Sequence, residues 1–160
     1  MDPAVVEIGA RQTLVRVAGS ATPLALGFEL MAETCLRHDP PTAAELERAI
    51  EAIEDELMLA RRSLPGGMGQ HLLAQGAALN EVAGAADAPA ELPLDAVERL
   101  FQRLASESLG NPSARQGLPA GNRFVATVLI LREFMHHLGF ASLRFEAAPH
   151  PTLAPEGRGL

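Results

Sequence analysis

The sequence predicts a single α/β domain built on a mixed β-sheet that is covered by helices. The chain has 160 residues, which suits one domain with a sizeable core and leaves little room for two. Its first 26 residues hold three short strand-like segments in close succession, a spacing typical of an antiparallel meander. The later strand-like segments are separated by helical ones, and strands joined by helical crossovers pair in parallel.

The three N-terminal strands differ in the signal that predicts them. Residues 4–8 are rich in valine and isoleucine and end at Gly9. Residues 12–17 alternate polar and apolar side chains, which is the period of a half-buried strand. Residues 22–26 form the third expected strand, which ends at Gly27.

Two helices are expected next. Apolar side chains share one face of residues 28–36, and the loop that contains Pro40 ends this helix, because a residue before proline avoids the α region. Thr42 and Glu45 have the spacing of a capping box, in which each side chain accepts a hydrogen bond from a free backbone N–H group. Apolar residues at helical spacing then predict a long amphipathic helix to about Arg62.

The rest of the chain alternates between strand and helix patterns. Gly139 has the position of a helix C-cap, and the Pro- and Gly-rich end reads as a loose tail. We therefore expect one domain over 1–146 and a tail over 147–160. The elements expected after residue 70 are a strand at 71–75, a helix at 77–82, a surface loop at 84–92, a helix from Leu94 to Leu104, a helix at 121–138 and a strand at 142–145.

Composition excludes several classes of function. The net charge of −7 argues against a nucleic-acid-binding protein, and the six aromatic residues, all Phe, offer no platform for base stacking. All 13 basic residues are arginine, so neither a Schiff-base lysine nor a P-loop lysine is available. No apolar run reaches the ~20 residues of a membrane span, and the N-terminus does not resemble a signal peptide. A single cysteine fits a reducing compartment, so we expect a cytoplasmic protein.

Three local patterns have a simpler structural interpretation than a functional one. The glycines of 66–69 follow a helix and precede a strand, which is the wrong order for a phosphate loop, so they predict a turn. Glu133 with His136 and His137 resembles half of a di-iron site, but no second such pair is evident, and a solvated helix end is expected. Cys35 is expected to be a small buried apolar residue, and no metal site is predicted.

Two strand-to-turn junctions have the positions of an anion site. Residues 9–13 link the first two strands, and Gly76 follows a strand and opens a helix, which is the order that cradles an anion. With their neighbours, these junctions resemble the second lobe of the exopolyphosphatase and guanosine pentaphosphate phosphohydrolase family, within the actin-like ATPase superfamily. The matching segments, in family order, are 7–13, 23–27, 39–41, 76–79, 94–98, 104–106, 117–120, 128–131 and 138–140.

The resemblance spans about residues 4–146 and implies a ribonuclease H-like, actin-type fold. It also implies a cleft between two lobes in which phosphate binds, with the water-activating carboxylate on the first lobe, for which we see no counterpart. Where the family has glycines in its phosphate loops, this sequence has Ala10, Arg11 and Ala77, whose Cβ atoms hinder close backbone approach to phosphate. Glu7 stands where the family has a magnesium-associated Asp, which makes it a weak metal candidate.

These departures predict a non-catalytic domain that acts as a binding or regulatory module and needs no cofactor. We expect self-association, or a partner protein, on the face of the missing lobe. The alternative is a residual phosphatase or a polyphosphate- or nucleotide-binding protein in which Arg11 replaces the glycine amides; only a phosphatase would need Mg²⁺. A further alternative is one half of a split enzyme. The anion-binding candidates are Gly9, Ala10, Arg11, Gln12, Thr13, Gly76 and Ala77.

Overall fold

A computed structural model describes residues 3–64 and 72–145 of the chain. The glycine turn expected at 66–69, the start of the strand expected at His71 and the tail expected at 147–160 lie outside these residues. Among the described residues, no helix is both long and apolar enough to cross a bilayer. The elements are β1 (Ala4–Ile8), β2 (Thr13–Val17), β3 (Ser20–Leu24), α1 (Phe28–Cys35), α2 (Ala43–Ala60), β4 (Leu72–Gln75), α3 (Ala77–Ala85), β5 (Glu91–Pro93), α4 (Leu94–Ser108), the 3₁₀ helix η1 (Pro112–Arg115), α5 (Asn122–Leu138) and β6 (Ser142–Phe145).

The strands form one six-stranded mixed sheet, as the sequence predicts, in the order β3-β2-β1-β4-β6-β5. β1, β2 and β3 pair antiparallel in an N-terminal meander. β1 pairs in parallel with β4, and β4 in parallel with β6. Because Glu7 is aligned with Gln75, the carboxyl ends of β1 and β4 meet at the same edge of the sheet.

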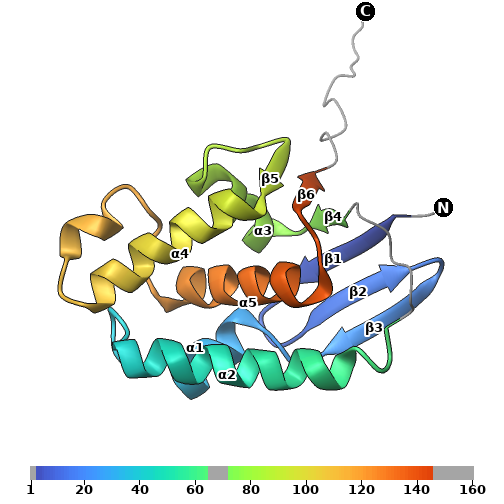
Figure 1. Ribbon diagram of the computed structural model, residues 1–160, viewed down its shortest axis with the longest axis horizontal. Helices are drawn as coiled ribbons and strands as arrows, with labels where there is room; N and C mark the ends of the chain where they lie inside the picture. Colours follow the sequence, from blue (N-terminus) through green and yellow to red (C-terminus); the bar gives the residue numbers. More distant parts are fainter. Residues whose placement is uncertain (1–2, 65–71, 146–160) are drawn as a thin grey trace, which may run out of the picture.

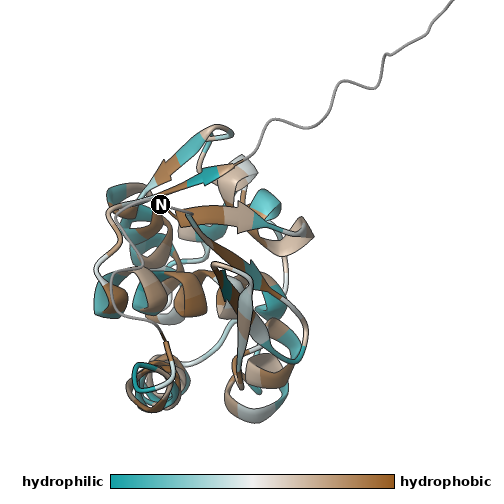
Figure 2. Ribbon diagram, turned by 90° about the vertical axis from the view of Figure 1, so that its right-hand side faces the viewer, coloured by the Kyte–Doolittle hydropathy of each residue, from teal (hydrophilic) through white to brown (hydrophobic). Residues whose placement is uncertain are grey.

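Helices cover one face of the sheet. The crossovers from β1 to β4 and from β4 to β6 step in the same direction across the sheet, so right-handed connections place their helices on the same side. Burial alternates along the strands accordingly: Val6 and Ala74 are buried, whereas the side chains of Glu7 and Arg144 on the other face are 41% and 53% exposed. Hydrophobic residues colour much of the central strands in Figure 2, where α2 and α5 run toward the viewer.

α5 lies at the centre of the helical layer (Figure 1). It contacts α1, α2, α3 and α4. Every residue from Phe124 to Leu131 is buried, so this part of the helix is buried around its whole circumference and belongs to the core. Gly139 ends it in the left-handed conformation (φ 79°) that glycine adopts without strain.

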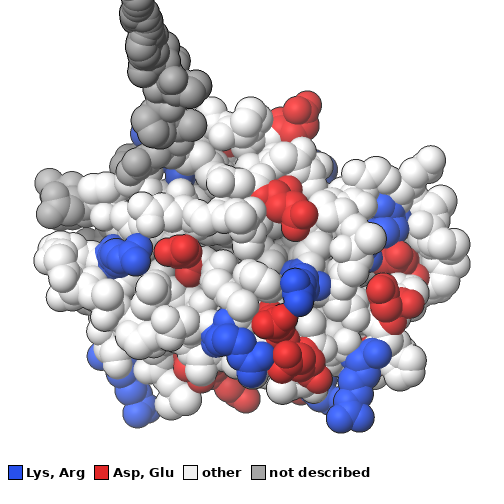
Figure 3. Space-filling view, turned by 180° about the vertical axis from the view of Figure 1, so that it is seen from behind, with Lys and Arg blue, Asp and Glu red and all other residues white. Residues whose placement is uncertain are grey.

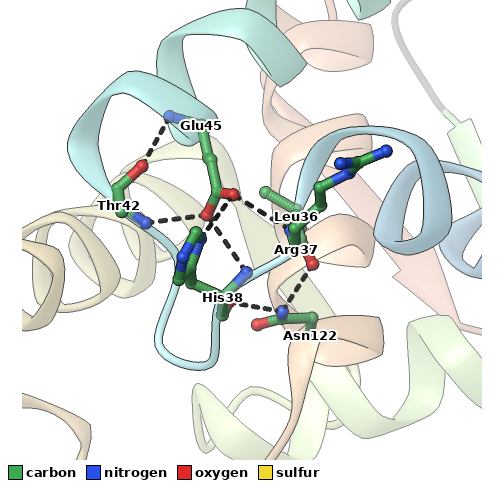
Figure 4. Close-up of polar contacts among 6 residues, drawn as sticks. All are labelled: Leu36, Arg37, His38, Thr42, Glu45 and Asn122. Carbon is green, nitrogen blue, oxygen red and sulfur yellow. Dashed lines mark hydrogen bonds and ion pairs between the residues drawn. The ribbon is translucent and has the colours of Figure 1, made fainter.

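The linker between α1 and α2 is fixed by the capping box that the sequence predicts (Figure 4). Thr42 Oγ1 accepts a hydrogen bond from the Glu45 N–H, and Glu45 Oε1 accepts one from the Thr42 N–H. The Glu45 carboxylate also accepts from the N–H groups of Arg37 and His38 and lies 2.9 Å from Nδ1 of His38. From α5, the Asn122 amide donates to the carbonyls of Leu36 and His38.

The structure differs from the sequence prediction mainly between α3 and α4. The prediction of a loop over 84–92 is wrong at both ends. α3 continues to Ala85, and Glu91–Pro93 forms the edge strand β5, which is antiparallel to β6. The third strand is Ser20–Leu24 rather than 22–26, because the turn consists of Ala18 and Gly19, both at positive φ. α4 runs on to Ser108, beyond the expected end at Leu104.

Candidate functional site

The N-termini of α1, α3 and α5 meet around one cavity of about 330 Å³. Its lining includes the first residue of α1, the first two residues of α3 and the first turn of α5. The lining residues are Phe28, Ala77, Ala78, Glu81, Ala120, Arg123, Phe124 and Thr127. The cavity adjoins the carboxyl ends of the parallel strands, where open α/β sheets bind ligands, and helix N-termini favour anions there.

Glycine precedes each of these three helices. Gly27, Gly76 and Gly121 are the N-cap residues, and none carries a side chain that could cap the first-turn N–H groups. Gly76 and Gly121 have φ values of 101° and 92°, which glycine tolerates and other residues rarely adopt. The first turns of α3 and α5 therefore receive no side-chain cap at the cavity wall.

The α1 N-terminus, in contrast, is already satisfied by the β1–β2 hairpin. The Phe28 N–H donates to the Gly9 carbonyl, and the Glu29 and Leu30 N–H groups donate to the Ala10 carbonyl. A Cβ at Gly27 would lie 2.3 Å from the Ala10 oxygen, so only glycine fits this contact. The carbonyls of the hairpin thus take the place that an anion would occupy at this helix end.

The remaining hairpin residues are also engaged. The Gly9 N–H donates to the Gln12 carbonyl and closes the turn. Thr13 is buried, and its hydroxyl donates to the Leu26 carbonyl at 2.7 Å, so it points away from solvent. Arg11 is exposed and forms a 2.8 Å ion pair with Glu33 of α1. This bond to Glu33, with a smaller effect of Glu29, raises the pKa of Arg11.

The two junctions singled out in the sequence do lie side by side. The Glu7 side chain packs against Gly76, where an added Cβ would lie 3.2 Å from its Cγ. Arg16 approaches both strands: its guanidinium lies 3.8 Å from the Glu7 carboxylate and donates to Gln75 at 3.2 Å. Glu7, the weak magnesium candidate, is thus paired with an arginine and places a negative charge beside the α3 N-terminus.

Arg123 is the basic residue of the cavity lining, and the sequence interpretation missed it. Its guanidinium forms a 2.6 Å ion pair with Glu29 of α1 and is 69% exposed. Arg115 fixes the loop ahead of it by donating to the carbonyls of Pro119 and Gly121. The sequence signal that could have revealed this position is a Gly-Asn-Arg segment that opens a helix after a proline-containing loop.

The electrostatic surroundings are mixed rather than basic. Figure 3 shows acidic and basic side chains intermingled over the face that it draws. At the cavity, Arg123 and the helix ends attract anions, while Glu29, Glu81 and the neighbouring Glu7 oppose them. An anion would therefore be bound by local groups of this cavity and not by a broad positive field.

The histidine pair at the end of α5 is less solvated than the sequence predicts. His136 is exposed, but Glu133 is only 3% exposed, and His137 lies 3.3 Å from it and 3.1 Å from Glu54 of α2. The expectation of a solvated helix end is thus wrong for Glu133. Cys35 is buried, as expected.

Comparison with known proteins identifies the fold through structure and not through sequence. No protein-family model matches the chain, and no curated protein matches it in sequence. Solved structures match over most of its length. A PPX-GPPA enzyme of Aquifex aeolicus superposes with a TM-score of 0.68 at 16% identity, covering 91% of this chain and 53% of that one.

Two further solved structures agree. An exopolyphosphatase-like protein matches with a TM-score of 0.68 at 13% identity, over 91% of this chain and 54% of that one. An exopolyphosphatase from Cytophaga hutchinsonii matches with a TM-score of 0.65 at 13% identity, over 89% and 52%. The chain thus spans about half the length of each neighbour, which agrees with the expected single lobe. It has the mixed α/β, actin-like fold found in one lobe of the Ppx/GppA proteins.

Proposed function

We propose that this domain is a binding module of the Ppx/GppA type that holds a phosphate-type anion without hydrolysing it. The observation that carries the proposal is the convergence of the glycine-capped N-termini of α3 and α5 and of Arg123 on one cavity at the carboxyl edge of the sheet. Free backbone N–H groups and the helix dipole favour a phosphate there. An arginine adds a planar donor that pairs with phosphate in a bidentate way.

The expected affinity is modest. An incoming anion competes with Glu29 for Arg123, and the Glu7 carboxylate lies beside the α3 N-terminus. Ala10 and Arg11 replace glycines of the resembled phosphate loop, and the carbonyls of Gly9 and Ala10 point into the α1 N-terminus. The hairpin therefore caps the N-terminus of α1, and in this proposal the anion binds at the N-termini of α3 and α5.

Absence of hydrolysis is the second part of the proposal. Glu7, the carboxylate closest to the cavity edge on β1, is paired with Arg16 at 3.8 Å and packs against Gly76. In this proposal the Glu7 carboxylate serves as the partner of Arg16 and does not activate water. Neither a cofactor nor Mg²⁺ enters this function.

Thermal unfolding in the presence of pyrophosphate and tripolyphosphate tests the binding. Both anions should raise the midpoint for the wild-type chain, and less so at high salt, which screens exposed charges. Arg123→Gln should weaken binding roughly tenfold or more, because a hydrogen bond to a charged group contributes about 1.5–3 kcal/mol. Arg48→Gln is the matched control, since Arg48 is exposed on α2 and absent from the cavity lining.

The other outcomes discriminate between the alternatives. Loss of binding in Arg11→Ala but not in Arg123→Gln would move the site to the 9–13 hairpin, as the sequence alone suggests. Mg²⁺-dependent phosphate release that disappears in Glu7→Gln would establish the residual phosphatase instead. If no anion shifts the midpoint at about 10 mM, where even weak binding with a Kd near 1 mM stabilises measurably, the anion-binding function is wrong.

A further inference from the structure

A second cluster of chemically active side chains lies at the opposite end of α5. Glu133 and His137 of α5 and Glu54 of α2 bring three possible ligand atoms within 4.8 Å of one another. His137 lies 14 positions after Arg123, and at 1.5 Å rise per residue this places the cluster about 20 Å from the cavity. The two sites are therefore independent.

The distances in the cluster suit a small divalent ion. Nε2 of His137 lies 3.1 Å from Oε2 of Glu54 and 3.3 Å from Oε1 of Glu133. Ligands placed about 2.0–2.2 Å from a tetrahedral Zn²⁺ lie about 3.3 Å from each other. The Glu54 side chain is 40% exposed, and its ligand oxygen lies within 4.8 Å of that of Glu133. Three such ligands leave the fourth position of a tetrahedral ion for water.

Charge balance provides a second, independent argument. Arg132 donates to Glu98 at 2.6 Å and to Oε2 of Glu133 at 2.5 Å, so one guanidinium serves two carboxylates. With Glu54, three carboxylates face a single arginine when His137 is neutral, which leaves a net charge of −2. Glu133 is 3% exposed and paired with Arg132, so the excess negative charge lies on the partly exposed carboxylates of Glu54 and Glu98. One divalent cation would neutralise it.

The support around the ligands is also of the kind that metal sites have. Arg132 holds the Glu133 oxygen that faces away from the cluster, and its guanidinium lies 4.1 Å from the centre of the Phe101 ring. Such outer contacts orient a metal-binding carboxylate. We propose that Glu54, Glu133 and His137 form a zinc site that links α2 to α5.

Titration of metal-free protein with Zn²⁺ alone, followed by calorimetry near pH 7, tests the proposal. The wild-type chain should bind one Zn²⁺, and the ion should raise the thermal midpoint. Replacing an outer contact of a metal site costs about 10- to 100-fold in affinity, so loss of a ligand in His137→Gln or Glu54→Gln should weaken binding at least tenfold. His136→Gln is the matched control: this histidine is adjacent on the same helix but exposed, and it lies outside the cluster.

Each alternative result is informative. Equal Zn²⁺ affinity in the wild type and His137→Gln, or loss of binding in His136→Gln instead, would overturn the site. So would the absence of binding by the wild-type chain at about 100 µM Zn²⁺, which would leave the cluster a plain ion-pair network. If His137→Gln fails to fold, the half-exposed Glu54→Gln carries the test.

Discussion

Glu45 illustrates how much of the local structure depends on one ionised side chain. Its carboxylate receives the His38 side chain at 2.9 Å and three backbone N–H groups from the linker and the α2 N-terminus. These hydrogen bonds lower the pKa of Glu45 from 4.5 to about 2. The bond from His38 has the largest effect, followed by the bond from the Thr42 N–H group, while burial acts in the opposite direction.

The depressed pKa makes a prediction about stability and pH. A carboxylate whose pKa is lower in the folded than in the unfolded state stabilises the fold above its unfolded pKa, and this contribution is lost as pH falls. Glu45→Gln should therefore unfold at a lower temperature than the wild type near pH 7, since the amide has only one acceptor oxygen. The difference should shrink between pH 4.5 and about 2, the two pKa values of Glu45.

Thermal unfolding followed by circular dichroism over this pH range provides the measurement. Glu47→Gln is the control, because Glu47 is exposed on the same helix and makes the same change of charge. If the difference in unfolding temperature between the wild type and Glu45→Gln stays constant from pH 7 to pH 2, the effect is not due to ionisation of Glu45.

Sequence reasoning identified some of these residue contacts and missed others for a physical reason. The Thr42–Glu45 capping box is local, since both partners lie within one helical turn, and it was predicted correctly. The Glu54–Glu133–His137 cluster joins residues 83 positions apart and exists only once α2 packs on α5. Arg123 likewise lines the cavity because the ends of neighbouring helices meet there, an arrangement that no single segment encodes.

At the scale of elements, α5 is the packing centre of the domain. Leu129 is fully buried in its middle, surrounded by helices on several sides. Leu129→Ala should destabilise the domain by about 2–5 kcal/mol, because truncation removes buried methyl groups and leaves a cavity. Chemical denaturation measures this free energy of unfolding.

The same substitution at an exposed position provides the comparison. Leu109 follows α4 and is 73% exposed, so Leu109→Ala should change the free energy of unfolding by no more than about 0.5 kcal/mol. Equal effects at both positions would contradict the central role of α5.

The prediction of elements succeeded where a hydrophobic pattern extends over many residues and failed where the segment is short. α2 and α5 were predicted over almost their full lengths. β5 was missed because it has three residues, ends in proline and follows an Ala/Pro-rich stretch; its strand conformation depends on pairing with β6. The sheet order was likewise open, since strand segments alone do not specify which neighbours pair.

At the scale of the whole molecule, the neighbours of known structure are about twice as long as this chain. The cavity and the hairpin of residues 9–13 lie at the edge of the sheet that the resemblance places in a cleft between two lobes. We expect the 160-residue chain to self-associate through this edge, which by that resemblance would face a second lobe.

Sedimentation velocity at about 50 µM, well above the dissociation constants of ordinary stable dimers, tests this expectation. The predicted result is a species of at least twice the chain mass of 16.9 kDa. A strict monomer at this concentration would argue against self-association and in favour of a different protein as partner.

The position of α5 and β6 near the end of the described chain has a consequence for synthesis on the ribosome. β6 lies between β4 and β5, so β5 has no strand partner until β6 has been translated. α1, α2, α3 and α4 all pack on α5, which begins only at Asn122. Emerging domains generally fold as units, and here the unit is incomplete until its last helix and strand leave the exit tunnel. Until then, the four helices that pack on α5 lack their common partner on the nascent chain.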